Sequence, residues 1–135
     1  MRAAGVNIAL FGGLAASFFV ALSALIQWVL GQPGIAGDQE LTHALFLILF
    51  ATGGPGYSVP LGLLMAGISV SAGFAKLLPK WLVVFGVILG IIGELSALDL
   101  LSHQALPLIP LTRFPAFVWM IAAGFKLPSH PFPTA

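Results

Sequence analysis

The stretch that decides the fold is Gly86-Val-Ile-Leu-Gly-Ile-Ile-Gly-Glu-Leu-Ser-Ala-Leu-Asp99, which is almost wholly apolar and is lined with glycine. In a helix of 3.6 residues per turn, Gly86, Gly90 and Glu94 are expected on one face. The two glycines expose backbone and favour close contact with another helix. A carboxylate inside a bilayer costs about 2.5–3.5 kcal/mol unless it is paired or hydrated. We therefore expect Glu94 to have a partner.

Composition assigns the chain to the membrane proteins. Of its 135 residues, 59% are hydrophobic and only 7% are charged, against about 25% charged residues in an average soluble domain. A soluble fold of this size cannot bury so much apolar surface, so the lipid bilayer is the expected environment. The net charge of +1 argues against nucleic acid as a partner. The absence of cysteine excludes disulfides and thiolate chemistry.

Apolar segments separated by polar or proline-bearing connections predict one integral all-α membrane domain over residues 1–135. We expect a bundle of four transmembrane helices, with one short apolar helix before the second. The segments are residues 6–30, 39–52, 57–77, 81–101 and 111–127, followed by a tail at 128–135. The first segment is longer than the apolar region of a signal peptide, so it is assigned as a membrane span.

Residues 41–78 are apolar almost throughout and are too long for a single span. A continuous helix there would be about 57 Å long, nearly twice a hydrocarbon core of about 30 Å. The sequence Gly53-Gly-Pro-Gly56 is the expected break. The preceding helix at 39–52 is short enough to lie in the outer interface, to re-enter the membrane, or to be covered by protein.

The same break is a candidate ligand site. Transporters build substrate sites from helices that are interrupted at membrane depth. The candidate ligand-binding residues are Gly53, Gly54, Gly56 and Ser58. A simple turn between two helices is the competing interpretation, and it is favoured because a lone Gly/Pro cluster is a weak signal.

The basic residues predict the orientation of the chain. On one side of the four-helix arrangement lie Arg2, Lys76, Lys80 and Lys126. On the other side lie Asp38, Glu40, Asp99 and Arg113. Because basic residues are enriched in cytoplasmic connections, both termini are expected to be cytoplasmic.

Glu94 and Arg113 are expected to form an intramembrane ion pair. Glu94 follows Trp81 by 13 residues and Arg113 precedes Lys126 by 13 residues, which places both about 20 Å from the cytoplasmic interface. Consecutive antiparallel helices are neighbours, so the two side chains can meet. Asp99 is the second-choice partner of Arg113. The pair is either an ion relay or, as favoured here, a buried contact that fixes helix docking.

The remaining candidates are weaker. Gly13, Ser17 and Ala21 form a small-residue stripe that favours helix packing. His43 and His103 are expected on the outer side, where metal binding or acid–base chemistry is conceivable. They are 60 residues apart and share no ligand spacing, so surface histidines are the better interpretation. No cofactor is expected.

A motif pattern runs through the second half of the chain. It consists of Leu78-Pro-Lys-Trp-Leu82, Gly86, Pro107, Pro110, Trp119 and Gly124-Phe125. Over residues 57–127 this pattern resembles the C-terminal part of a large family of bacterial multi-pass proteins of unknown function, which show L-P-R/K-W-L and W-L-I-x-x-G-F. Members are generally longer, often with six helices, and the N-terminal half of this chain departs from them. The resemblance implies a multi-pass protein of the bacterial inner membrane and no particular activity.

The favoured function from the sequence is a non-enzymatic membrane component that associates with itself or with other membrane protein subunits. Glycine-lined faces and the over-long apolar outer segment suggest surfaces for protein contact. One alternative is a small-molecule or ion carrier that uses residues 53–58 and Glu94. The other is an outer-face enzyme, which would depend on His43 or His103.

Overall fold

The computed structural model describes residues 2–102, 104 and 106–127; His103 and the predicted tail at 128–135 lie outside the described residues. The described residues are helical almost throughout and contain no strand. The elements are α1 (Arg2–Leu30), η1 (Ile35–Gly37), α2 (Gln39–Gly53), α3 (Pro55–Phe74), α4 (Lys80–Leu95), η2 (Ser96–Leu100) and α5 (Leu108–Lys126). The all-α class is therefore confirmed for this part of the chain.

In the described part of the chain, four helical stretches are long and apolar enough to cross a membrane. They are Ala4–Leu30, Gln39–Phe74, Lys80–Leu100 and Leu108–Lys126. The second stretch joins α2 and α3, which the sequence analysis treats as a short separate helix and a span.

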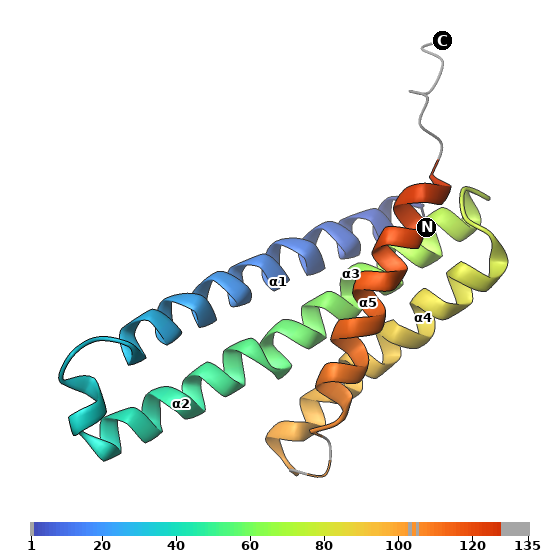
Figure 1. The fold of residues 1–135 in the computed structure, drawn as a ribbon. Coiled ribbons are helices and arrows are strands. Elements are labelled where there is room, and N and C mark those ends of the chain that lie inside the picture. Colours follow the sequence, from blue (N-terminus) through green and yellow to red (C-terminus); the bar gives the residue numbers. More distant parts are fainter. Residues whose placement is uncertain (1, 103, 105, 128–135) are drawn as a thin grey trace.

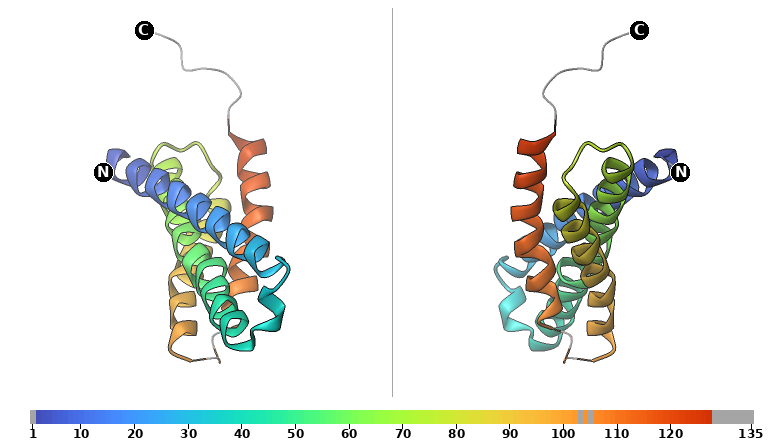
Figure 2. Two further views of the ribbon diagram at one scale, coloured as in Figure 1. Left: turned by 90° about the vertical axis from the view of Figure 1, so that its left-hand side faces the viewer. Right: turned by 90° about the vertical axis from the view of Figure 1, so that its right-hand side faces the viewer.

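Helix α3 is the centre of the structure. It contacts α1 on one side and α4, η2 and α5 on the other, and it continues from α2. Figures 1 and 2 show α1 antiparallel to the long α2–α3 unit, and the α4–α5 hairpin against α3. Half of the residues of α3 are buried, including Leu61 and Met65, which are 2% and 0% exposed. The stretch at 86–99 is thus a neighbour of the central helix rather than the centre.

Bare backbone brings α1 close to α3. A Cβ on Gly67 of α3 would lie 2.7 Å from both the Ala9 nitrogen and the Gly5 oxygen of α1. A Cβ on Gly12 would lie 2.6 Å from the Pro60 oxygen. Such distances exclude a side chain at these glycines without movement of backbone, so the two helices touch through their main chains.

The predicted stripe on α1 lies beside this contact rather than in it. Gly13 is half-buried, and Ser17 and Ala21 are exposed. The buried residues of α1 are instead Gly5, Ala9, Gly12 and Ala16, which recur every three or four residues and so share one face of the helix. One residue turns a helix by about 100°, so the stripe that begins at Gly13 lies at the side of the contact, where a Cβ on Gly13 would be 3.4 Å from the Leu64 side chain of α3.

The contact between α3 and α4 is also made by glycine. A Cβ on Gly62 would lie 2.8 Å from the Gly90 oxygen, and a Cβ on Gly93 would lie 2.9 Å from the Ser58 oxygen. Gly86 and Gly90 therefore lie at helix contacts, Gly86 against Ser69 and Trp119.

Helix α5 is attached to α4 mainly through Trp119. Its side chain is 1% exposed and its indole Nε1 donates a hydrogen bond to the Leu82 oxygen at 2.7 Å. A Cβ on Gly86 would lie 2.7 Å from the indole nitrogen, so the bare backbone of Gly86 leaves room for the ring.

The break in the second apolar stretch falls within residues 53–56, as predicted. Gly54, with φ −91° and ψ −103°, separates α2 from α3. The Gly54 nitrogen donates to the Phe50 oxygen at 2.8 Å, and the Ser58 nitrogen donates to the Gly54 oxygen at 2.9 Å. These two bonds keep the helical spacing on either side of the break, and Figure 1 shows α3 continuing α2 with little change of direction. Residues 39–52 thus extend the second long helix, and none of the residues of α2 is buried.

The basic connections gather at one end of the molecule. Figure 1 shows the N-terminus, the turn from α3 to α4 and the last turn of α5 at this end, and η1 and η2 at the opposite end. The basic residues of these connections are Lys76, Lys80 and Lys126, which are all exposed.

Candidate site at the helix break

The break between α2 and α3 removes one regular hydrogen bond from the helix backbone. Residue Pro55 has no N–H to donate back to Ala51. The Ala51 oxygen therefore lacks the hydrogen bond that a regular helix would give it from the residue four positions later. At membrane depth, such groups are tolerated only where protein or water can satisfy them.

Side chains from α1 and α5 border the break. An ideal Cβ on Gly53 would lie 3.2 Å from the Ser23 oxygen of α1, and one on Gly54 would lie 3.1 Å from Ile109 of α5. The predicted ligand residues at 53–56 are therefore enclosed by protein on two sides. Ser58, the fourth candidate, is completely buried, and its hydroxyl has no hydrogen-bond partner among the described residues.

Asp99 is a buried acidic residue of this region. It is 4% exposed, and neither of its carboxylate oxygens has a hydrogen-bond partner in the part of the chain that the structure describes. Its element, η2, contacts α3, α4 and α5. Gly93 lies against Ser58 and Gly62 of α3, and Asp99 is about 10 Å further along the chain. Because α3 and α4 are antiparallel, Asp99 lies level with the break at Gly54.

The 3₁₀ geometry of η2 explains the burial of Asp99. Residues three apart share one face in a 3₁₀ helix, whereas three residues of an α-helix turn through about 300°. Gly93, Ser96 and Asp99 are all buried. The Ser96 hydroxyl donates to the Gly93 oxygen at 2.6 Å, at the point where α4 gives way to η2. If residues 81–101 formed one α-helix, as predicted, Asp99 would lie on a different face from Gly93 and Ser96.

Glu94 lies on the outside of the bundle. It is exposed, whereas its neighbour Gly93 is buried against α3. At about 100° per residue, Glu94 is rotated about 80° from Gly86 around the helix axis, because it lies eight residues further on. Gly93 lies seven residues further on and is rotated by only about 20°. The glycine face is therefore completed by Gly93 and not by Glu94.

Arg113 is half-buried and lies over an aromatic ring. Its guanidinium carbon is 5.0 Å from the ring centroid of Tyr57, in the first turn of α3. Within the described residues, the structure does not bring Arg113 and Glu94 together as an ion pair. Arg113 does not hydrogen-bond Asp99, the second-choice partner, because both Asp99 oxygens lack a partner there. The stacking on Tyr57 is a cation–π contact, which the spacing of acids and bases along the sequence does not reveal.

The histidines do not form a metal site in the described part of the chain. His43 is exposed on α2. Over the described ranges, no group of three or more His, Cys, Asp or Glu side chains could hold a metal ion. The other candidate, His103, lies outside those ranges.

Over the residues that the structure describes, the fold is all-helical, with four helices long and apolar enough to cross a membrane. Comparisons of the chain with protein-family models, curated proteins and solved structures found no match. The resemblance of residues 57–127 to a bacterial multi-pass family therefore stays a prediction.

Proposed function

We propose that this chain is a multi-pass membrane protein that carries an ion or a small molecule, with Asp99 rather than Glu94 as its intramembrane carboxylate. The observation that supports this proposal is the burial of Asp99 without a hydrogen-bond partner among the described residues. Ionisable groups within membrane spans are costly, and those that persist commonly line ion pathways or substrate sites.

The donor set around the break favours a hard cation. Asp99 offers a carboxylate level with the break, where Pro55 leaves the Ala51 oxygen without its regular helical donor. Oxygen ligands of this kind suit hard cations, and transporters coordinate Na⁺ or H⁺ with the ends of interrupted helices. The ion that we propose is a sodium ion or a proton, which would neutralise Asp99. Arg113 adds a positive charge beside the first turn of α3, where a carboxylate of a small molecule could bind.

Substitution of Asp99 tests this proposal. Purified protein in a mild detergent is expected to gain thermal stability as NaCl replaces choline chloride, because binding to the folded state alone stabilises it. In proteoliposomes, wild-type protein is expected to move Na⁺ or protons. Asp99→Asn is expected to lose the cation-dependent stabilisation and the flux by at least tenfold.

Glu94→Gln is the matched control. It removes a carboxylate from the same helical segment, but from an exposed position, and it is expected to retain both responses. The carrier proposal is contradicted if wild-type protein shows neither response, or if Asp99→Asn retains them. A loss in Glu94→Gln alone would return the intramembrane role to Glu94.

A second candidate function is helix-mediated assembly with another copy or another membrane subunit. It is favoured by the small-residue stripe on α1, where Ser17 and Ala21 are exposed and unused by the fold. A groove of about 490 Å³ runs beside this stripe and is lined by Leu10, Gly13, Ser17 and Leu64 among others. Small residues at a helix surface permit close approach of a second helix.

Cysteine cross-linking tests the assembly proposal, because the chain has no native cysteine. Ser17→Cys is expected to give a disulfide-linked dimer in native membranes after mild oxidation. Ile121→Cys, on a position of α5 that is 62% exposed, is the control and is expected to stay monomeric. Equal cross-linking at both positions, or none at Ser17→Cys, argues against assembly of two copies through the stripe.

The basic end of the molecule is the end that we propose to face the cytoplasm. Lys76, Lys80 and Lys126 are exposed there. The acidic residues Asp38 and Glu40 belong to the opposite end, at the start of α2. This distribution follows the positive-inside rule and supports cytoplasmic termini in a bacterial inner membrane.

A further inference from the structure

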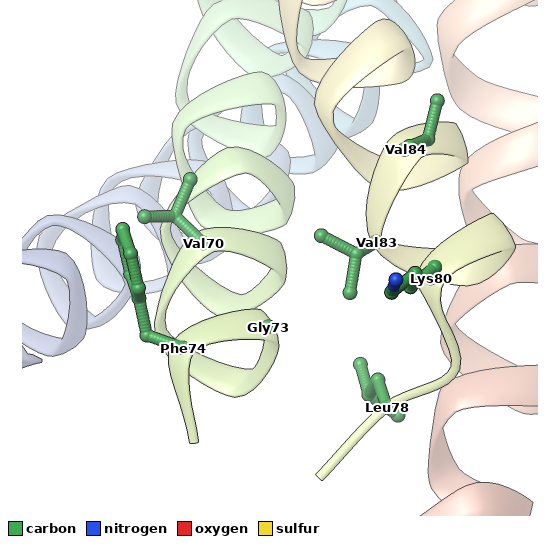
Figure 3. Close-up of a pocket in the computed structure, with 7 residues that line it drawn as sticks. All are labelled: Val70, Gly73, Phe74, Leu78, Lys80, Val83 and Val84. Carbon is green, nitrogen blue, oxygen red and sulfur yellow. The ribbon is translucent and has the colours of Figure 1, made fainter. Parts of the chain in front are cut away.

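A groove at the basic end lies far from the helix break. It lies between the last turns of α3 and the first turns of α4, and it has a volume of about 430 Å³, within the range of about 300–1,000 Å³ for small-molecule sites. Figure 3 shows its walls, which are formed by Val70, Gly73, Phe74, Leu78, Val83 and Val84.

The groove contains one charged residue, Lys80, in an otherwise apolar lining. Figure 3 shows the Lys80 nitrogen on the groove side of α4, between Val83 and Leu78. The lining therefore combines two chemistries, a long apolar surface and a single ammonium group. An amphiphile with an anionic head complements both of them.

A second lysine lies in the same turn and in an unusual backbone conformation. Lys76 follows the C-terminus of α3 with a φ of 56°, in the left-handed region. The Lys76 nitrogen donates to the Gly73 oxygen and the Leu77 nitrogen donates to the Ala72 oxygen, at 3.1 and 2.9 Å. These two bonds form a Schellman motif, whose left-handed position is usually glycine. A lysine here carries a conformational cost, which is consistent with a role for its side chain.

We propose that this groove binds one phospholipid with an anionic headgroup. The phosphate binds Lys80, with Lys76 adding positive charge in the same turn, and an acyl chain lies along Phe74 and the valines of the groove. Basic pockets between membrane helices on the cytoplasmic side are suited to acidic lipids. Phe74 and Val84 are 60% and 57% exposed, so the groove opens to the apolar surroundings from which a lipid would enter. This proposal does not depend on ion transport at Asp99.

Lipid titration of the purified full chain tests the proposal. The probes are dioleoylphosphatidylglycerol and dioleoylphosphatidylcholine, added to detergent-solubilised protein, with binding read by native mass spectrometry and by thermal stability. Saturable binding of one phosphatidylglycerol is expected, with phosphatidylcholine binding at least tenfold more weakly. Lys80→Gln is expected to weaken phosphatidylglycerol binding by about tenfold, as for loss of a charge-assisted contact.

Lys76→Gly separates binding from folding. It relieves the left-handed lysine, so the melting temperature of the lipid-free protein is expected to rise while phosphatidylglycerol binding weakens. Lys126→Gln removes an exposed charge at the same end, outside the groove, and is expected to leave binding unchanged.

Three results would overturn the lipid proposal. They are equal binding of the two lipids, equal weakening by Lys126→Gln and Lys80→Gln, and full competition by inorganic phosphate, which would indicate an anion site without an acyl chain. Asp99→Asn is expected to bind phosphatidylglycerol normally, so failure of the carrier proposal and failure of the lipid proposal can be told apart.

Discussion

Replacing Gly62 with leucine is expected to destabilise the bundle by about 3 kcal/mol, at the upper end of the usual cost of overpacking. A Cβ at this position would meet the Gly90 oxygen at 2.8 Å and the Gly93 Cα at 3.2 Å. Both are main-chain atoms, which cannot move aside as the end of a flexible side chain can. The two helices must separate, and α4 carries η2 and α5 with it.

Unfolding of the Gly62→Leu variant can be followed by circular dichroism in a mild detergent as sodium dodecyl sulfate is added. Gly124→Leu is the matched control, because it makes the same chemical change in a helix at a glycine with no neighbouring heavy atom within 4 Å. It is expected to leave the free energy of unfolding unchanged or to raise it by up to about 1 kcal/mol, because glycine is a poor helix former. Equal stabilities of the two variants would mean that α3 and α4 do not pack through Gly62.

Replacing Trp119 with alanine is expected to cost about 3–5 kcal/mol, the range for large-to-small changes of buried aromatic residues. The indole is 1% exposed, fills the space beside Gly86 and donates its N–H to the Leu82 oxygen. Trp119→Phe keeps most of the volume and loses the hydrogen bond, so about 1–2 kcal/mol is expected. The same detergent unfolding experiment measures both changes.

Phe125 provides the control for Trp119. It lies on the same helix and is 85% exposed, so Phe125→Ala is expected to change the stability by less than about 0.5 kcal/mol. A Trp119→Ala variant as stable as Phe125→Ala would show that α5 does not depend on Trp119 for its attachment to α4.

The residues at the ends of the helices were largely predictable, because helix ends depend on local chemistry. Proline and glycine act through their own backbone, whatever surrounds them. Pro79 precedes α4, Gly54 divides α2 from α3, and α1 ends at Leu30, before the Gly31 to Gly37 connection. One local feature was not predicted: the 3₁₀ helix η2 replaces the last turn of the span predicted at 81–101.

The packing faces were much less predictable, because these helices are apolar all round. In a soluble helix the polar face shows which side is buried, whereas here the choice of face depends on which small residues meet. The stripe predicted on α1 consists of Gly13, Ser17 and Ala21, whereas the closest backbone contacts with α3 are made at Gly5 and Gly12. The predicted stripe and the buried set that contains Gly5 and Gly12 both have helical spacing. Only the position of Gly67 on α3 shows which of the two sets makes the contact.

By itself, the sequence determined the helical class, the four long apolar stretches and the position of the helix break, since these follow from composition and from the backbone chemistry of single residues. Only the tertiary structure decided which charges share the interior. It placed Asp99 on the buried face of η2, Glu94 on the outside of the bundle, and Arg113 over the Tyr57 ring. The physical reason is rotational: a change of about 20° per residue between α-helical and 3₁₀ geometry, carried over a few residues, moves a side chain from one face of a helix to another.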